Sequence, residues 1–172
     1  EGQEHVILAD TSVKLMQKLH QMYSGTVKFE DGKSMVLDTF KAEYIKNYFK
    51  DKKIAIFYKF KEEYNALKEV YGSNICNTLE EFCNTEKNIA LQIVSGREGI
   101  SLKEADALVY YNIDFSATSY WQSRDRMTTK KRLNNNVYWV FTSNGIEPDI
   151  YKAVTKKKDY TLKHFKKDLL SV

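Results

Sequence analysis

Short apolar runs alternate with amphipathic stretches along most of this chain. The run Lys53–Tyr58 is almost continuously apolar, which is typical of a strand that is buried on both faces of a sheet. Further apolar runs, each bounded by turn residues, predict strands over Asn74–Cys76, Asn88–Val94, Ala107–Tyr111 and Val137–Thr142.

Between these runs, apolar residues recur at helical spacing. The first amphipathic stretch is Leu8–Tyr23, with Asp10, Thr11 or Ser12 as its N-cap and Gly25 beyond its end. Further helices are predicted over Lys41–Phe49, Lys61–Tyr71, Leu79–Thr85, Ser116–Met127, Ile146–Val154 and Tyr160–Leu170.

A β-hairpin is predicted after the first helix. The short runs Thr26–Phe29 and Ser34–Leu37 flank Asp31-Gly32, and an Asp-Gly pair in that position is a strong signal for a tight turn.

Length and composition fit one domain. The chain has 172 residues, of which 42% are hydrophobic and 29% charged, so it can bury a packed core. Strands that alternate with helices predict a mainly parallel sheet with helices on both faces. We therefore expect a single three-layer α/β unit with a helix–hairpin–helix lead-in at 1–50, a core at 51–155 and a basic C-terminal helix at 156–172.

Basic residues gather at the C-terminal end. The whole chain has a formal net charge of +4, while Tyr151–Val172 holds seven lysines and two aspartates, a net charge of +5. A basic tail on a nearly neutral body favours a polyanionic partner. A solvated, lysine-rich helix face is the alternative interpretation.

Arginine is confined to one part of the chain. Of the 27 basic residues only four are arginine, namely Arg97, Arg124, Arg126 and Arg132. The planar guanidinium group is well suited to phosphate, so this window is a candidate phosphate-binding region.

Several classes of site are disfavoured. Gly32-Lys33-Ser34 resembles the end of a phosphate-binding loop, but Gly25 does not have the required spacing and a hairpin occupies the place of the helix. No Asp-Glu pair ends an apolar strand to hold Mg²⁺. Two cysteines and three scattered histidines predict no metal site and no disulfide framework. No apolar run approaches the roughly 20 residues of a membrane helix, so no membrane partner is expected.

Two segments at predicted strand ends could contact phosphate. Ser95–Leu102 contains two glycines, which allow a backbone to approach a ligand closely. Gln122, Arg124 and Arg126 lie on the helix that follows the next strand, where arginines could clamp a triphosphate. Ligands of parallel sheets bind beyond the carboxyl ends of the strands, so both segments are candidates. A plain turn and a surface helix with an Asp125 ion pair are the alternatives.

In combination, these segments resemble the motifs of superfamily 2 helicases and translocases, especially the Swi/Snf-related branch and its phage or prophage type. The matching segments are Ile54–Lys59 for motif IV, Ser95–Leu102 with Ala105-Asp106 for motif V, Gln122-Ser123-Arg124 with Lys130-Lys131 for motif VI, and Ile146-Glu147 with Ile150-Tyr151 for the closing segment. The resemblance runs from about residue 5 to residue 160.

The resemblance implies a RecA-like fold of the P-loop NTPase type and a role as the C-terminal lobe of an ATP-dependent DNA helicase or translocase. ATP would bind between this lobe and an N-terminal RecA-like lobe of the same protein, which would supply the phosphate loop and hold Mg²⁺. The chain alone would then hydrolyse no ATP. We expect an intracellular protein that binds DNA without sequence preference.

Residue by residue, the resemblance and the basic tail give the following candidates. They are Arg124 and Arg126 for catalysis, Gly99, Ser101 and Gln122 for the nucleotide, and Ser95, Gly96, Arg97, Lys59, Lys156 and Lys157 for nucleic acid.

The register of motif VI has two solutions. The family's two arginines are three positions apart, hence about 60° apart on a helix. If Arg124 is the first, the second position holds Met127; if Gln122 opens the motif, the positions hold Arg126 and Thr129. Arg124 and Arg126 lie about 200° apart on a regular helix and cannot both face one phosphate. The sequence Gln-Ser-Arg favours Arg124.

Two other function classes remain. A non-catalytic α/β nucleic-acid-binding module would explain the basic tail but not the clustered arginines. A stand-alone nucleotide enzyme is disfavoured by the misplaced Gly32-Lys33-Ser34.

Overall fold

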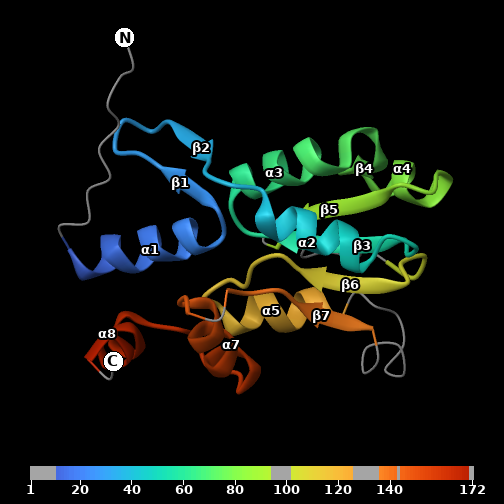
Figure 1. The fold of residues 1–172 in the computed structure, drawn as a ribbon. Coiled ribbons are helices and arrows are strands. Elements are labelled where there is room, and N and C mark those ends of the chain that lie inside the picture. Colours follow the sequence, from blue (N-terminus) through green and yellow to red (C-terminus); the bar gives the residue numbers. More distant parts are fainter. Residues whose placement is uncertain (1–10, 94–101, 126–135, 143, 171–172) are drawn as a thin grey trace, which may run out of the picture.

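The computed structural model describes residues 11–93, 102–125, 136–142 and 144–170. These residues form an α/β fold around a five-stranded sheet of order β4-β5-β3-β6-β7, in which every neighbouring pair is parallel (Figure 1). The strands are β3 Ile54–Tyr58, β4 Ile75–Cys76, β5 Asn88–Gln92, β6 Ala107–Tyr110 and β7 Val137–Trp139. The predicted α/β class is confirmed.

The helices lie close to the residue ranges predicted from the sequence. They are α1 Ser12–Tyr23, α2 Phe40–Tyr48, α3 Lys61–Tyr71, the short 3-10 helix η1 Gly72–Asn74, α4 Leu79–Asn84, α5 Ala117–Arg124, α7 Glu147–Thr155 and α8 Leu162–Leu170. Helix α5 ends at Arg124 with Asp125 as its C-cap, and the last position of the predicted helix, Met127, lies outside the described residues. Strand β7 ends three residues earlier than predicted.

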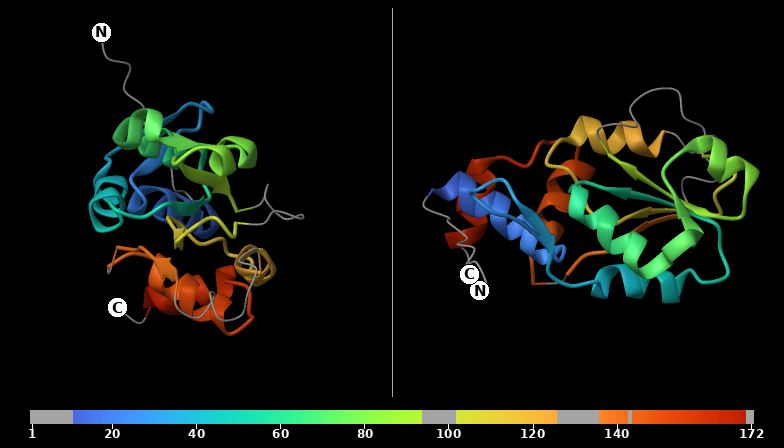
Figure 2. Two further views of the ribbon diagram at one scale, coloured as in Figure 1. Left: turned by 90° about the vertical axis from the view of Figure 1, so that its right-hand side faces the viewer. Right: turned by 90° about the horizontal axis from the view of Figure 1, so that it is seen from above.

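Each face of the sheet carries its own apolar layer. Alternate side chains of β3 point to opposite faces, so Ile54 and Ile56 contact the layer of α2 and α3, whereas Ala55 and Phe57 face the layer that includes α5 and α7. Figure 2 shows α2 and α5 on opposite sides of the sheet. Helices on both faces explain why β3 and β6 are almost continuously apolar and buried.

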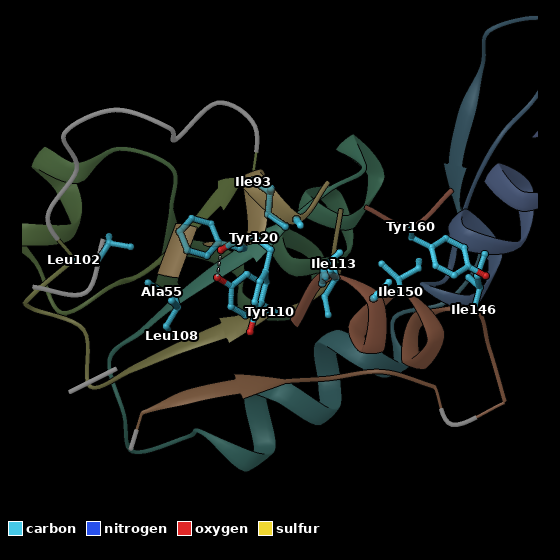
Figure 3. Close-up of a cluster of buried hydrophobic side chains, with 14 of the residues drawn as sticks. Ala55, Ile93, Leu102, Leu108, Tyr110, Ile113, Tyr120, Ile146, Ile150 and Tyr160 are labelled. Carbon is cyan, nitrogen blue, oxygen red and sulfur yellow. Dashed lines mark hydrogen bonds between the residues drawn. The ribbon is translucent and has the colours of Figure 1, made fainter. Parts of the chain in front are cut away.

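The second layer reaches well beyond the sheet. Buried side chains continue from Leu102 and Ala55, past Tyr110 and Tyr120, to the ring of Tyr160 in the α7–α8 connection (Figure 3). One continuous cluster therefore joins the sheet to the C-terminal helices.

The lead-in packs against the same body. Strands β1 Thr26–Lys28 and β2 Ser34–Val36 form the predicted antiparallel hairpin. The Thr11 hydroxyl accepts a hydrogen bond from the backbone N–H of Lys14 at 3.2 Å, which identifies Thr11 as the N-cap of α1. Gly25 has φ +82°, and a Cβ there would lie 2.9 Å from the backbone oxygen of Asp38. Only glycine fits this turn without strain.

The carboxyl ends of the parallel strands point toward the lead-in. In Figure 1 the arrowheads of β5 and β6 are directed toward the side where α1 and the hairpin lie, and α1 packs there beside α8. Among the described helices, none has the length and apolar character needed to cross a membrane.

Candidate functional site

Helix α5 is fixed at its start and near its end. The Ser116 hydroxyl caps it by accepting from the backbone N–H of Ser119 at 3.3 Å. Its first N–H, that of Ala117, donates to the Asp159 carboxylate at 2.9 Å, a favourable place for a negative charge because helix N-termini carry partial positive charge. Further along, the buried Ser123 hydroxyl is hydrogen-bonded to the hydroxyl of Tyr110 at the end of β6.

Arg124 lies at the last position of α5, among aromatic rings. Its guanidinium carbon is 5.2 Å from the centroid of Trp121, 5.9 Å from Trp139 and 6.0 Å from Tyr120. The side chain is half-buried. Stacking on rings restrains a planar guanidinium group while its edge remains able to donate hydrogen bonds, which is the arrangement that favours arginine over lysine.

Gln122 occupies a different face of α5. It is exposed, as Thr118 and Asp125 are, whereas Tyr120 and Ser123 are buried. Residues two apart on a helix point about 200° apart, so Gln122 and Arg124 do not converge on one point from this helix.

The structure instead brings Arg124 close to the basic tail. The Lys157 ammonium lies 5.4 Å from the ring centroid of Trp121, the same ring that Arg124 contacts. Lys156, Lys157 and Lys158 are all exposed in the turn after α7. A residue predicted for catalysis and a residue predicted for nucleic acid therefore share one indole ring.

Lys59 has an internal partner. Its ammonium lies 2.8 Å from the Asp114 carboxylate, and the two side chains are only 19% and 14% exposed. The ammonium also lies 4.7 Å from the ring centroid of Phe115. This ion pair ties the carboxyl end of β3 to the segment after β6, so the charge of Lys59 is largely neutralised within the chain.

The remaining candidates lie outside the described residues. They are Ser95, Gly96, Arg97, Gly99, Ser101 and Arg126. Their assignments, and the choice between the two motif VI registers, stay predictions.

A buried polar chain crosses the same edge of the sheet. His20 Nε2 and Asn112 Oδ1 are 2.6 Å apart, and Asn112 Nδ2 donates to Glu63 at 2.9 Å. Because Asn112 Oδ1 also accepts from the backbone N–H of Ile113, His20 Nε2 is the donor in the contact with Asn112. Burial, with a smaller effect from Lys59, lowers the pKa of His20 to about 3. Burial raises the pKa of Glu63.

The buried neutral histidine predicts a pH-dependent stability. Between pH 3 and pH 6.5 the unfolded chain binds a proton at His20 that the folded chain does not, so stability is lost as the pH falls below 6.5. From pH 7 to pH 5, this one group should lower the free energy of unfolding by about 2 kcal/mol. Urea unfolding of the wild type and of His20→Gln measures the difference.

The comparison of two proteins isolates His20. Glu147, whose pKa burial raises, is outside the His20–Asn112–Glu63 chain, so its opposite slope is the same in both proteins and cancels in the difference. His164 on α8, which is not buried, provides the control variant His164→Gln. Equal pH slopes for the wild type and His20→Gln would contradict the assignment of a buried neutral His20.

A buried ion pair between Lys41 and Glu147 was not predicted from the sequence. The Lys41 ammonium on α2 lies 2.6 Å from the Glu147 carboxylate on α7, and it also donates to the backbone oxygen of Tyr111 at 2.9 Å. Glu147 accepts a further hydrogen bond from the backbone N–H of Thr142 at 3.1 Å. The sequence placed Glu147 in the closing segment but gave no sign that Lys41, 106 residues away, is its partner.

Within the part of the chain that the structure describes, no group of three or more His, Cys, Asp or Glu side chains could hold a metal ion.

The sheet order, the helices on both faces and the position of α5 after β6 are those of a RecA-like α/β lobe. Among solved structures, the chain is similar in fold to the C-terminal part of the Fun30 ATPase domain, with a TM-score of 0.57 and 18% sequence identity. The match covers 72% of this chain and 47% of that one, so this chain spans about half of its structural neighbour. No protein-family model and no curated protein matches the chain. The expected phage or prophage type gains no support from this comparison.

Proposed function

We propose that this chain is the C-terminal lobe of a superfamily 2, Swi/Snf-like, ATP-dependent DNA helicase or translocase. The observation that carries the proposal is the fold, a RecA-like lobe similar to part of an ATPase domain. The order of the glycine-containing segment after β5 and the arginine-bearing helix after β6 agrees with motifs V and VI of that family.

The restrained geometry of Arg124 supports a role toward phosphate. Its guanidinium carbon lies 5.2 Å and 5.9 Å from the ring centroids of Trp121 and Trp139 at the end of a capped helix, and these contacts restrict where the charge can lie. Preorganised positive charge is effective when negative charge develops on a transferring phosphoryl group. Gln122, which is proposed for the nucleotide, lies on the exposed face of α5 and would contact it from a different direction than Arg124.

The site would be completed by the N-terminal RecA-like lobe of the same protein. ATP would supply the phosphoryl group that is transferred to water, and the partner lobe would hold Mg²⁺ and the triphosphate. Arg124 would donate to phosphate oxygens from the opposite side of the cleft. Gly99, Ser101 and, in the alternative register, Arg126 are the further proposed contacts.

DNA is the proposed polyanion. Six exposed lysines of the α7–α8 turn and of α8 would contact its phosphates, namely Lys156, Lys157, Lys158, Lys163, Lys166 and Lys167. Ser95, Gly96 and Arg97 are proposed to extend this contact with DNA. Lys59 is paired with Asp114, so its proposed contact with DNA would be weaker than that of the exposed lysines.

Binding of DNA should therefore be weak, independent of sequence and steeply dependent on salt. If each of the six lysines neutralises one phosphate, the slope of log K against log salt is about −4 to −5, so doubling the salt weakens binding roughly 20- to 40-fold. Fluorescence anisotropy with labelled oligonucleotides of unrelated sequence measures this slope.

Matched triple variants locate the surface. Changing Lys163, Lys166 and Lys167 to glutamine should make the slope less steep by about 2 to 3. The control changes the exposed Lys50, Lys52 and Lys68 to glutamine and should leave the slope unchanged. Binding that ignores salt, or that selects one sequence, would contradict the proposal.

A further inference from the structure

Trp121 is held between two helices and carries two cations. Its indole N–H donates to the backbone oxygen of Val154 on α7 at 2.9 Å. Arg124 lies 5.2 Å and Lys157 lies 5.4 Å from the centroid of its ring. Cations are attracted to the face of an indole more strongly than to that of any other side chain, and here two of them depend on the same ring.

The backbone of Lys157 is held in an unfavourable conformation. Lys157 has φ +59°, and among the described residues it is the one non-glycine residue with a positive φ. Its N–H donates to Val154 at 3.0 Å and the N–H of Lys158 donates to Ala153 at 3.1 Å, which is the paired pattern of a helix C-terminus that normally has glycine in the left-handed position. Lysine at this position is less stable than glycine would be.

The segment that contains Lys157 also holds α5 in place. Asp159 accepts from the first N–H of α5, and the N–H of Tyr160 donates to the backbone oxygen of Phe115 at 2.8 Å, just before that helix. These two contacts fasten the start of α5 to the α7–α8 connection, and the Trp121–Val154 bond fastens its middle to α7. Figure 1 shows α5 and α7 side by side. A displacement of the connection is therefore transmitted to α5.

We propose that the turn Lys156–Lys158 is a phosphate-binding surface for a nucleic-acid backbone and that Trp121 links its occupancy to the position of Arg124. Phosphate oxygens that bind Lys157 draw its ammonium away from the indole. Arg124 is then the one of these two cations that still contacts the Trp121 ring. Trp121 is thus a positioning residue for Arg124. This inference rests on the proposed function, which assigns roles to Arg124 and to the basic tail.

The geometry explains why lysine occupies the left-handed position. A glycine would relieve the backbone but would remove the Lys157 side chain that reaches from the basic turn to Trp121. Lys157→Gly is therefore expected to raise Tm by about 2–4 °C while it weakens the response to DNA. Stabilisation together with loss of response separates a functional role from a structural one.

The fluorescence of Trp121 reports on this contact directly. The chain has two tryptophans, so a Trp139→Phe background leaves Trp121 as the sole indole emitter and keeps an aromatic ring beside Arg124. Titration with a short single-stranded oligonucleotide should change Trp121 emission with the same midpoint as binding measured by anisotropy. Lys157→Gln should abolish most of this change and make the salt slope of binding less steep by about 1.

The controls separate the possible sources of phosphate. Lys68→Gln removes one exposed charge from α3 on the other face of the sheet and should alter neither signal. ATP and inorganic pyrophosphate, titrated at equal charge, should change Trp121 emission much less than the oligonucleotide. An equal response to these small phosphates would overturn the assignment to a nucleic-acid backbone.

The failures of the two proposals are distinguishable. If the chain binds DNA with the expected salt dependence but Trp121 emission and the Lys157→Gln variant are both unaffected, this inference is wrong and the proposed function stands. If Trp121 responds to DNA but ATP turnover is absent when the partner lobe is supplied, the proposed function is wrong and the phosphate-binding surface stands.

Discussion

Replacing Lys41 with methionine is expected to lower the free energy of unfolding by about 3–5 kcal/mol. Lys41 and Glu147 form an ion pair in which the side chains are only 7% and 0% exposed, and the pair joins α2 to α7. Without Lys41, the Glu147 carboxylate remains buried with the N–H of Thr142 as its other hydrogen-bond donor among the described residues. An uncompensated buried charge is more destabilising than the loss of one interaction.

The pair Lys152–Asp149 on α7 is the matched control. Its charged atoms are 3.9 Å apart and Lys152 is 74% exposed, so Lys152→Met should change stability by less than about 1 kcal/mol. The double variant Lys41→Met, Glu147→Gln should recover most of the lost stability because no charge stays buried. Urea unfolding of all four proteins provides the free energies. A Lys41→Met effect no larger than that of Lys152→Met would contradict the buried ion pair.

The pH dependence of the Lys41→Met effect provides an independent test of the buried ion pair. Burial already raises the pKa of Glu147, and removal of Lys41 raises it further. An acid whose pKa is raised in the folded state gains stability as the pH falls toward that pKa. The destabilisation by Lys41→Met should therefore shrink as the solution is acidified.

Local signals in the sequence predicted the elements well. Helix α3 matches its predicted bounds because an amphipathic run ends at Gly72, whose positive φ of +59° breaks the helix. Strand β3 was recognisable because a parallel strand covered on both faces must be apolar throughout. The hairpin followed from Asp31-Gly32.

Contacts between segments that are distant in the sequence could not be predicted from local sequence patterns. Lys41 was predicted as an ordinary helix residue, and nothing near it in the sequence points to Glu147. Trp121 and Lys157 belong to different elements, so their contact depends on how α5 and α7 pack. By contrast, the separation of Gln122 from Arg124 follows from helical geometry alone and was predictable.

Arg124→Ala is expected to lower ATP turnover by about 10³- to 10⁵-fold in a protein that joins this lobe to its N-terminal partner. An arginine that reaches phosphate across a cleft stabilises charge that develops in the transition state. Arg124→Lys should fail nearly as badly, because an ammonium does not reproduce the planar donor fork that Arg124 holds beside Trp121 and Trp139.

Two controls accompany this change. Thermal melting is needed because Arg124 is half-buried and its loss also removes contacts with the aromatic rings. Arg126→Ala tests the alternative register of motif VI. If Arg126→Ala is inactive and Arg124→Ala is normal, the register of the motif is the alternative one while the lobe assignment holds.

Steady-state ATP turnover in the presence of DNA, measured for this chain alone and for the two-lobe protein, tests the central claim most directly. We predict turnover no higher than background for the isolated chain, and DNA-stimulated turnover for the two-lobe protein that Arg124→Ala abolishes. Turnover by the isolated chain, purified free of other ATPases, would contradict this account. The account would also be contradicted if the two single variants of the two-lobe protein, Arg124→Ala and Arg126→Ala, each turned over ATP like the wild type.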